Sequence, residues 1–151
     1  MTDHSRKAVE LFRSGYNCSQ AVFAAFSDVT GIDEKTSVKM ASPFGGGLGR
    51  LREICGAVSG MSLAAGCLWG YDDTENKDAK TEHYALISGM AKDFAEVFGS
   101  YICKDILAIK TTEYSPVAEN RTPEFYALRP CERCVAVAAE ILDKRIEQTE
   151  K

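Results

Sequence analysis

The sequence predicts an all-α fold, a single-domain helical bundle of about five to six helices within residues 1–151. Three observations carry this prediction. Apolar residues recur at the three- to four-residue spacing of amphipathic helices along most of the chain. No segment shows the two-residue alternation of a half-buried strand, and glycines or prolines separate the helical runs. A chain of 151 residues, 45% of them hydrophobic, is long enough to bury a core without disulfide bonds.

Three helical runs are expected before Pro43. Gly15 and Gly31 can end the first two, because glycine readily adopts the left-handed backbone angles that terminate helices. Asn17 and Asp33 can cap the second and third, since their side chains accept hydrogen bonds from free N–H groups at helix starts. The three runs cover about residues 8–14, 18–29 and 34–42.

A glycine-rich loop is expected at residues 44–50, because four glycines in five positions would destabilise a helix. The loop could bind an anion through its backbone N–H groups, with Arg50 and Arg52 beside it. No Lys-Ser/Thr pair follows, unlike in a phosphate-binding P-loop. This favours the alternative, in which the glycines let the backbone pass close to a neighbouring helix and to Cys18.

The next helix is expected from about Arg52 to Trp69. Its Gly56, Gly60 and Ala64 form a row with almost no side chain, so another helix can approach closely there. This is the longest apolar stretch of the chain, but glycines and serines interrupt it and it is shorter than the roughly 20 residues of a membrane span. It therefore predicts a buried core helix and no membrane insertion.

The clearest amphipathic helix is expected at residues 79–98, and Gly99 can end it. Ser100 can cap a further turn or two that contains Cys103. Residues 110–130, with three prolines, are expected to be irregular, and the last helix is expected from Pro130 to about Gln148. The apolar stripe of the 79–98 helix contains Ile87, Met90, Phe94 and Val97.

Charge and terminal sequence exclude several classes of function. The net charge is −4 and basic residues are scattered, so nucleic acid is not an expected partner. The first residues show no apolar signal-peptide region, which predicts a cytoplasmic protein. Thiols in a reducing compartment are more often catalytic, metal-binding or buried than disulfide-bonded. A homo-oligomer is compatible with the sequence.

Four of the six cysteines are expected at helix beginnings. Free N–H groups and a partial positive charge at a helix start stabilise a thiolate relative to the thiol. The thiolate is both the nucleophile and the metal ligand, so this placement indicates redox or metal chemistry. The four positions are Cys18 after Asn17, Cys55 after the glycine loop, Cys103 after Ser100 and Cys131 after Pro130.

Cys131 and Cys134 form a CxxC pair at a predicted helix start, as in dithiol oxidoreductases. A thioredoxin-like site would need a preceding strand, and a zinc ribbon would need a second close cysteine pair; neither is found. The alternative is that Cys134 faces the core with Val137, Ala138 and Ile141, since a free cysteine packs as a small hydrophobic residue.

Three further residues are interpreted structurally. Cys67 lies about 120° around the helix from Cys55 and is expected to fill the core. His83 lies on the stripe of the 79–98 helix, where a hydrogen-bonded core histidine is preferred over a proton shuttle or metal ligand. His4 lies in a terminus that is expected to fray.

The ordered cysteine motifs resemble a family of redox-active proteins named for its C…GCAxxG…C…C pattern. The resemblance covers about residues 5–145 and implies a helical protein of this size with four characteristic cysteines. The family label writes GCAxxG, whereas this chain has Cys-Gly-Ala at 55–57. The matching segments are Gly15-Tyr16-Asn17-Cys18-Ser19-Gln20-Ala21-Val22, Cys55-Gly56-Ala57-Val58-Ser59-Gly60, Cys103 and Cys131, with Cys134 as the alternative fourth cysteine.

Three hypotheses for the function follow. The first is a cytosolic thiol–disulfide redox protein, oxidoreductase-like, in which Cys55 or Cys131 attacks and a second cysteine of the pattern resolves the mixed disulfide. Its partner would be a small-molecule or protein thiol or disulfide, and it needs no cofactor. The second is a zinc or iron–sulfur site whose ligands are Cys18, Cys55, Cys103 and Cys131. The third is a structural or interaction protein with buried cysteines.

Overall fold

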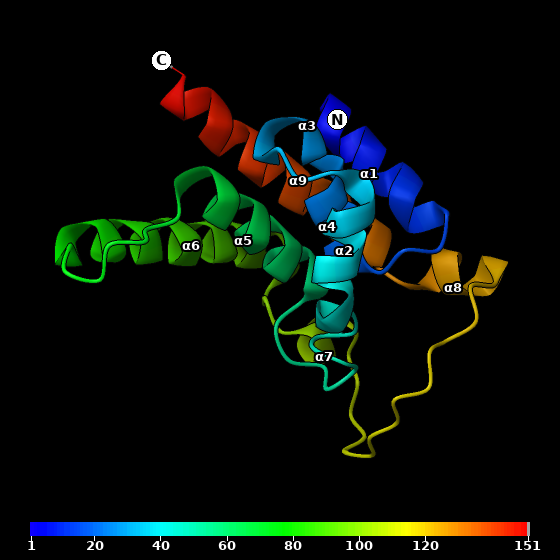
Figure 1. Cartoon of the computed structure of the whole chain (residues 1–151). Helices are drawn as coiled ribbons and strands as arrows, with labels where there is room; N and C mark the ends of the chain where they lie inside the picture. The colour runs from blue at the N-terminus through cyan, green and yellow to red at the C-terminus, as the bar shows by residue number, and fades with distance from the viewer. Residues whose placement is uncertain (151) are drawn as a thin grey trace.

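The computed structural model describes residues 1–150, which are mostly helical (Figure 1). Within this range there is no strand, only one isolated β-bridge between Ile54 and Ile102, so the all-α prediction is confirmed. Six α-helices have eight or more residues, and three short ones have four to six. The helices are α1 (Asp3–Arg13), α2 (Cys18–Ala25), α3 (Ser27–Thr30), α4 (Glu34–Ala41), α5 (Gly56–Trp69), α6 (Lys77–Phe98), α7 (Cys103–Ile106), α8 (Pro123–Leu128) and α9 (Cys131–Thr149). A 3-10 turn, η1 (Ser42–Phe44), follows α4.

Local capping sequences set most helix boundaries as predicted. The Asn17 side chain accepts a hydrogen bond from the Gln20 N–H, and the Gln20 side chain accepts one from the Asn17 N–H, so α2 begins with a complete capping box. Asp33 caps α4 with a single hydrogen bond, which its side chain accepts from the Thr36 N–H. Gly99 has a left-handed backbone angle, φ 79°, where α6 ends.

Several boundary predictions are wrong. The predicted helix over residues 18–29 is divided into α2 and α3 at Phe26, whose φ and ψ of −100° and 17° are not helical, and the first helix starts at Asp3 and not near Ala8. Helix α5 begins at Gly56 and not near Arg52, because Arg52 has a left-handed φ of 61° that a helix cannot contain. Ser100 does not cap α7, which begins at Cys103 after Ile102. The irregular region contains the unpredicted helix α8, which begins with the favourable cap-and-proline pair Thr122-Pro123.

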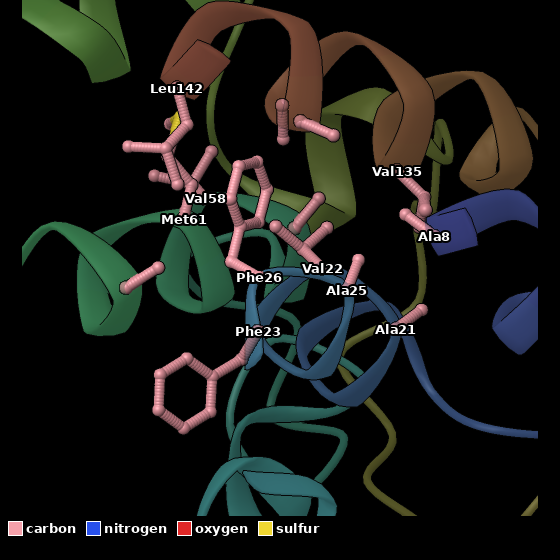
Figure 2. Close-up of a cluster of buried hydrophobic side chains, with 14 of the residues drawn as sticks. Ala8, Ala21, Val22, Phe23, Ala25, Phe26, Val58, Met61, Val135 and Leu142 are labelled. Carbon is pink, nitrogen blue, oxygen red and sulfur yellow. The ribbon is translucent and has the colours of Figure 1, made fainter. Parts of the chain in front are cut away.

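The core is built around α2, which contacts α1, α4, α5 and α9. Figure 2 shows Val22 of α2 and Phe26, which follows the end of α2, among side chains from the neighbouring helices, including Met61 of α5 and Leu142 of α9; all four are fully buried. Helices α2 and α5 cross in direct backbone contact, because a Cβ atom at Gly60 would lie 2.6 Å from the Ser19 carbonyl oxygen. The predicted close approach at the glycine row of α5 is confirmed.

Helix α6 lies beside α5 and extends away from the other helices in Figure 1. Met90 and Phe94 of its predicted stripe are buried, whereas Val97 is 42% exposed. Among residues 1–150, no helix combines the length and the apolar character needed to cross a bilayer.

Candidate functional site

A pocket of about 610 Å³ lies where the beginnings of α2, α5, α7 and α9 converge. The four predicted helix-start positions are confirmed: three of the cysteines are the first residues of α2, α7 and α9, and the fourth is the cap residue of α5. Helical packing thus brings together cysteines that are far apart in the sequence. Five of the six cysteines line the pocket: Cys18, Cys55, Cys103, Cys131 and Cys134.

Cys18 and Cys131 form the first thiol pair. The Cys18 thiol donates a hydrogen bond to the Cys131 sulfur. That hydrogen bond lowers the pKa of Cys131 to about 7. Burial of the thiol opposes this shift, and three nearby guanidinium groups assist it, those of Arg129, Arg121 and Arg52. The same hydrogen bond, together with burial, raises the pKa of Cys18 well above its ordinary value. Near neutral pH about half of Cys131 is therefore thiolate, while Cys18 keeps its proton.

Cys55 and Cys134 form a second, deeper pair. Cys134 is 1% exposed and its thiol donates a hydrogen bond to the Cys55 sulfur. This hydrogen bond lowers the pKa of Cys55 against the effect of burial, with help from the backbone N–H groups of Ala57 and Val58 at the start of α5. It raises the pKa of Cys134 far above the ordinary thiol value. Cys134 thus packs in the core, as the alternative interpretation predicts, and its hydrogen-bond partner is Cys55 and not Cys131 of the CxxC pair.

Cys103 lies at a helix start but is not activated by it. The side chain is buried, and burial raises the pKa of its thiol above the ordinary value. Arg52 lies with Nη1 3.8 Å from the Cys103 sulfur and lowers the pKa, but it offsets only part of the burial effect. Helix α7 has only four residues, so its N-terminus adds little favourable charge.

Three arginines converge on one carboxylate, which no sequence pattern indicated. Glu119 Oε1 lies 3.0 Å from Arg50, 3.2 Å from Arg52 and 2.6 Å from Arg129. Partial burial raises the pKa of Glu119, but these guanidinium groups together bring it below its ordinary value. The two arginines next to the glycine loop were candidates for anion binding. Glu119 and Arg129 lie in the 110–130 region, where no periodic pattern indicates a site.

The glycine loop brings its arginines to the pocket through an unusual backbone path. Gly46 to Arg50 all have positive φ angles, between 54° and 73°. A Cβ atom at Gly45 would lie 2.3 Å from the Asn17 side chain, so the loop passes directly against the start of α2. The Leu48 and Gly49 N–H groups donate to carbonyls of the same segment. The preferred interpretation of these glycines, close approach to a neighbouring helix, agrees with this geometry.

Three structural interpretations need correction. Cys67 is exposed on α5 and does not fill the core. His4 is not frayed: its ring forms hydrogen bonds with Asp28 at 2.8 Å and with Asp143 at 2.6 Å, and it stacks on Phe26. His83 is half-buried, but its Nδ1 atom has no hydrogen-bond partner in residues 1–150.

Four of the thiols form two hydrogen-bonded pairs within one pocket. Within residues 1–150, no group of three or more cysteine, histidine, aspartate or glutamate side chains is placed to hold one metal ion. A tetrahedral zinc site or an iron–sulfur cluster requires four thiolates around a common centre. The described residues contain no such grouping.

Comparison with known proteins identifies one family. The family model described as "Putative redox-active protein (C_GCAxxG_C_C)" matches residues 16–145, a stretch that contains all five pocket cysteines. Searches of curated proteins and of solved structures gave no match.

Proposed function

The chain belongs to the C_GCAxxG_C_C family, and on this premise we propose that it is a thiol–disulfide redox protein in which Cys131 attacks and Cys18 resolves. The observation that carries the proposal is the contact between these two thiols at the starts of α2 and α9. It provides a thiolate near neutral pH and, beside it, a protonated thiol that can act in the second step.

The reaction consists of two exchange steps. The Cys131 thiolate attacks one sulfur of a disulfide substrate, the substrate S–S bond breaks, and the departing thiolate takes the proton of Cys18. The Cys18 thiolate then attacks the Cys131 sulfur of the mixed disulfide. The second half of the substrate leaves as a thiolate and is protonated by solvent. The substrate gains two electrons, and the protein gains a Cys18–Cys131 disulfide.

The deeper pair can extend this reaction. Cys134 lies three residues after Cys131 on α9, so both side chains are on the same face of the helix. Cys134, after passing its proton to the Cys55 thiolate, would attack Cys131 and displace Cys18, whose thiolate takes the proton back from Cys55. Cys55 would then attack Cys134 and displace Cys131, so a Cys55–Cys134 disulfide forms, Cys18 and Cys131 are reduced again, and no oxidant is added. We place this chemistry in the cytoplasm, where the glutathione and thioredoxin systems return dithiols to the reduced state. Cys103 is not assigned an attacking function.

Disulfide mapping tests the proposal. Protein purified without oxygen is treated with one equivalent of the neutral probe 2-hydroxyethyl disulfide, and its disulfides are mapped by mass spectrometry. We expect a Cys18–Cys131 disulfide in the wild type. We expect a mixed disulfide trapped at Cys131 in the double variant Cys18→Ser/Cys134→Ser, because it lacks both thiols that could resolve it. The matched control, Cys67→Ser, should react like the wild type, because Cys67 lies outside the pocket.

Metal and sulfide analysis on the same preparation tests the alternative. Stoichiometric iron with sulfide, or stoichiometric zinc, together with thiols that resist titration, would contradict the proposal and support a four-thiolate site. Unchanged disulfide formation in Cys131→Ser would also contradict it, since Cys18 would then have no partner in the first pair.

A further inference from the structure

The thiol pocket contains more positive charge than the chain as a whole would suggest. The protein carries a net charge of −4, yet four arginines line this one pocket. Among the described residues that line it, Glu119 is the single acidic side chain. We define the arginine cluster as the three that contact Glu119, namely Arg50, Arg52 and Arg129. The fourth, Arg121, donates hydrogen bonds to two backbone carbonyls and stacks on Phe12.

One carboxylate cannot neutralise this cluster. Glu119 supplies a single negative charge to three guanidinium groups, and the backbone partners of Arg121 are formally neutral. Even with a thiolate at Cys131, positive charge remains in excess. Carboxylates are recognised by arginine because their two oxygens match the planar donor pairs of the guanidinium group. In the ligand-free protein both oxygens of Glu119 accept from the single Nη2 atom of Arg129.

The arginine cluster is held in place at a cost in backbone strain. Arg50 and Arg52 have φ angles of 66° and 61°, left-handed values that are sterically unfavourable for a residue with a Cβ atom. Such strain is concentrated at ligand clamps and active sites. The side chains of the cluster are between 17% and 25% exposed, so a ligand in solution can reach them.

We propose that the substrate of the thiol pocket is an anionic disulfide, a small molecule with a carboxylate near its sulfur atoms, and that this carboxylate binds the arginine cluster in place of Glu119. The inference rests on the proposed thiol–disulfide function and adds the chemical class of its substrate. Arg52 connects the two parts of the site, because it contacts Glu119 through Nη2 and the Cys103 sulfur through Nη1. The pocket volume of about 610 Å³ lies within the range of small-molecule sites.

Glu119 belongs to a segment that must move away from the arginine cluster when such a ligand binds. Residues 110–122 form no helix, and Arg50 holds them against the glycine loop through the Ser115 carbonyl at 2.8 Å and the Val117 carbonyl. The carboxylate of Glu119 thus occupies the position of the substrate carboxylate in the ligand-free protein. Binding exchanges one set of carboxylate contacts for another, so the cluster stays paired in both states.

A charge series of disulfides tests the substrate class. We compare the oxidation rates of the reduced protein by 3,3′-dithiodipropionate, neutral 2-hydroxyethyl disulfide and cationic cystamine at pH 7 and low salt. The anionic disulfide should react at least about tenfold faster than the neutral one, with a preference that declines as salt is added. In Arg50→Gln the rate with the anionic disulfide, divided by the rate with the neutral disulfide, should fall toward one. Arg145→Gln, which removes an arginine bound to Asp93 outside the pocket, is the matched control and should keep the wild-type ratio.

A redox-inert probe separates binding from chemistry. Suberate has the chain length and both carboxylates of dithiodipropionate but no sulfur, so its binding can be measured by calorimetry without any thiol reaction. It should bind the wild type, bind Glu119→Gln more tightly and bind Arg50→Gln more weakly. Equal rates for all three disulfides, or no suberate binding to either wild type or Glu119→Gln, would overturn the inference. If no disulfide reacts but suberate binds as described, the anion site stands and the proposed redox function fails.

Discussion

Cys131 and Cys103 occupy the same position in their helices, but their thiol pKa values are shifted in opposite directions. Each is the first residue of a helix, each lines the same pocket, and Arg52 acts on both. Yet the pKa of Cys131 is lowered to about 7, whereas that of Cys103 is raised above the ordinary thiol value. A helix beginning is therefore not sufficient to activate a cysteine in this protein.

The difference comes from the partners of each sulfur. Cys131 accepts a hydrogen bond from the Cys18 thiol and lies near three guanidinium groups, which together outweigh burial. Cys103 has Arg52 as its hydrogen-bond donor, and burial outweighs that single contact. Helix length also favours the thiolate at Cys131 over one at Cys103, since α9 has 19 residues and α7 has four, and a longer helix has a more positive N-terminus.

The largest expected effect separates the two cysteines directly. At pH 7 about half of Cys131 is thiolate, compared with about 1% of an ordinary thiol, and the lower intrinsic nucleophilicity of an acidic thiol reduces this advantage to the order of tenfold. Cys131→Ser should remove the fast phase of iodoacetamide labelling, and Cys103→Ser should leave it intact. Mass spectrometry of the adducts over time measures both.

Cys67 provides an internal reference for that experiment. It is exposed, but partial burial raises the pKa of its thiol, so it should label slowly despite its accessibility. Equally fast labelling of Cys67 and Cys131 would show that access, and not the hydrogen bond from Cys18, controls reactivity.

The second expected effect removes the hydrogen-bond donor. Because the thiolate fraction grows as pH rises through the pKa, labelling of Cys131 should be half-maximal near pH 7 in the wild type. In Cys18→Ala the midpoint should move up toward the ordinary value of 9.0, and labelling at pH 7 should slow by several-fold to about tenfold. Cys18→Ser keeps a hydroxyl donor and should retain most of the shift. Identical pH profiles for the alanine and serine variants would contradict this explanation.

The smallest expected effect concerns the surrounding charge. Arg129→Gln removes one of the three guanidinium groups that favour the Cys131 thiolate, so the midpoint should rise by less than in Cys18→Ala. We expect about threefold slower labelling at pH 7, in line with a partly solvent-screened charge. Arg145→Gln serves as the control, and its pH profile should match the wild type. A larger shift in Arg129→Gln than in Cys18→Ala would mean that the guanidinium charge, and not the Cys18 hydrogen bond, is the main cause of the low pKa.

Interactions within one helical turn could be read from the sequence. The caps at Asn17 and Asp33 and the helix end at Gly99 depend on atoms that lie at most four residues apart along the chain. The same holds for the glycine-rich loop and for the placement of four cysteines at helix starts. The all-α class follows from these local patterns together with the apolar spacing.

Only the tertiary structure decided which of these groups meet. The pairing of Cys18 with Cys131 depends on how α2 packs against α9, and the approach of Glu119 to Arg52 depends on the path of an irregular segment. The exposure of Cys67 was mispredicted for the same reason, because it depends on which side of α5 a neighbouring helix covers. A thiol pKa depends on donors and charges within a few ångströms, and in this protein those atoms come from segments distant in sequence. Local sequence placed four of the six cysteines at helix starts, and packing determined which of these four has a thiol pKa low enough to form a thiolate near neutral pH.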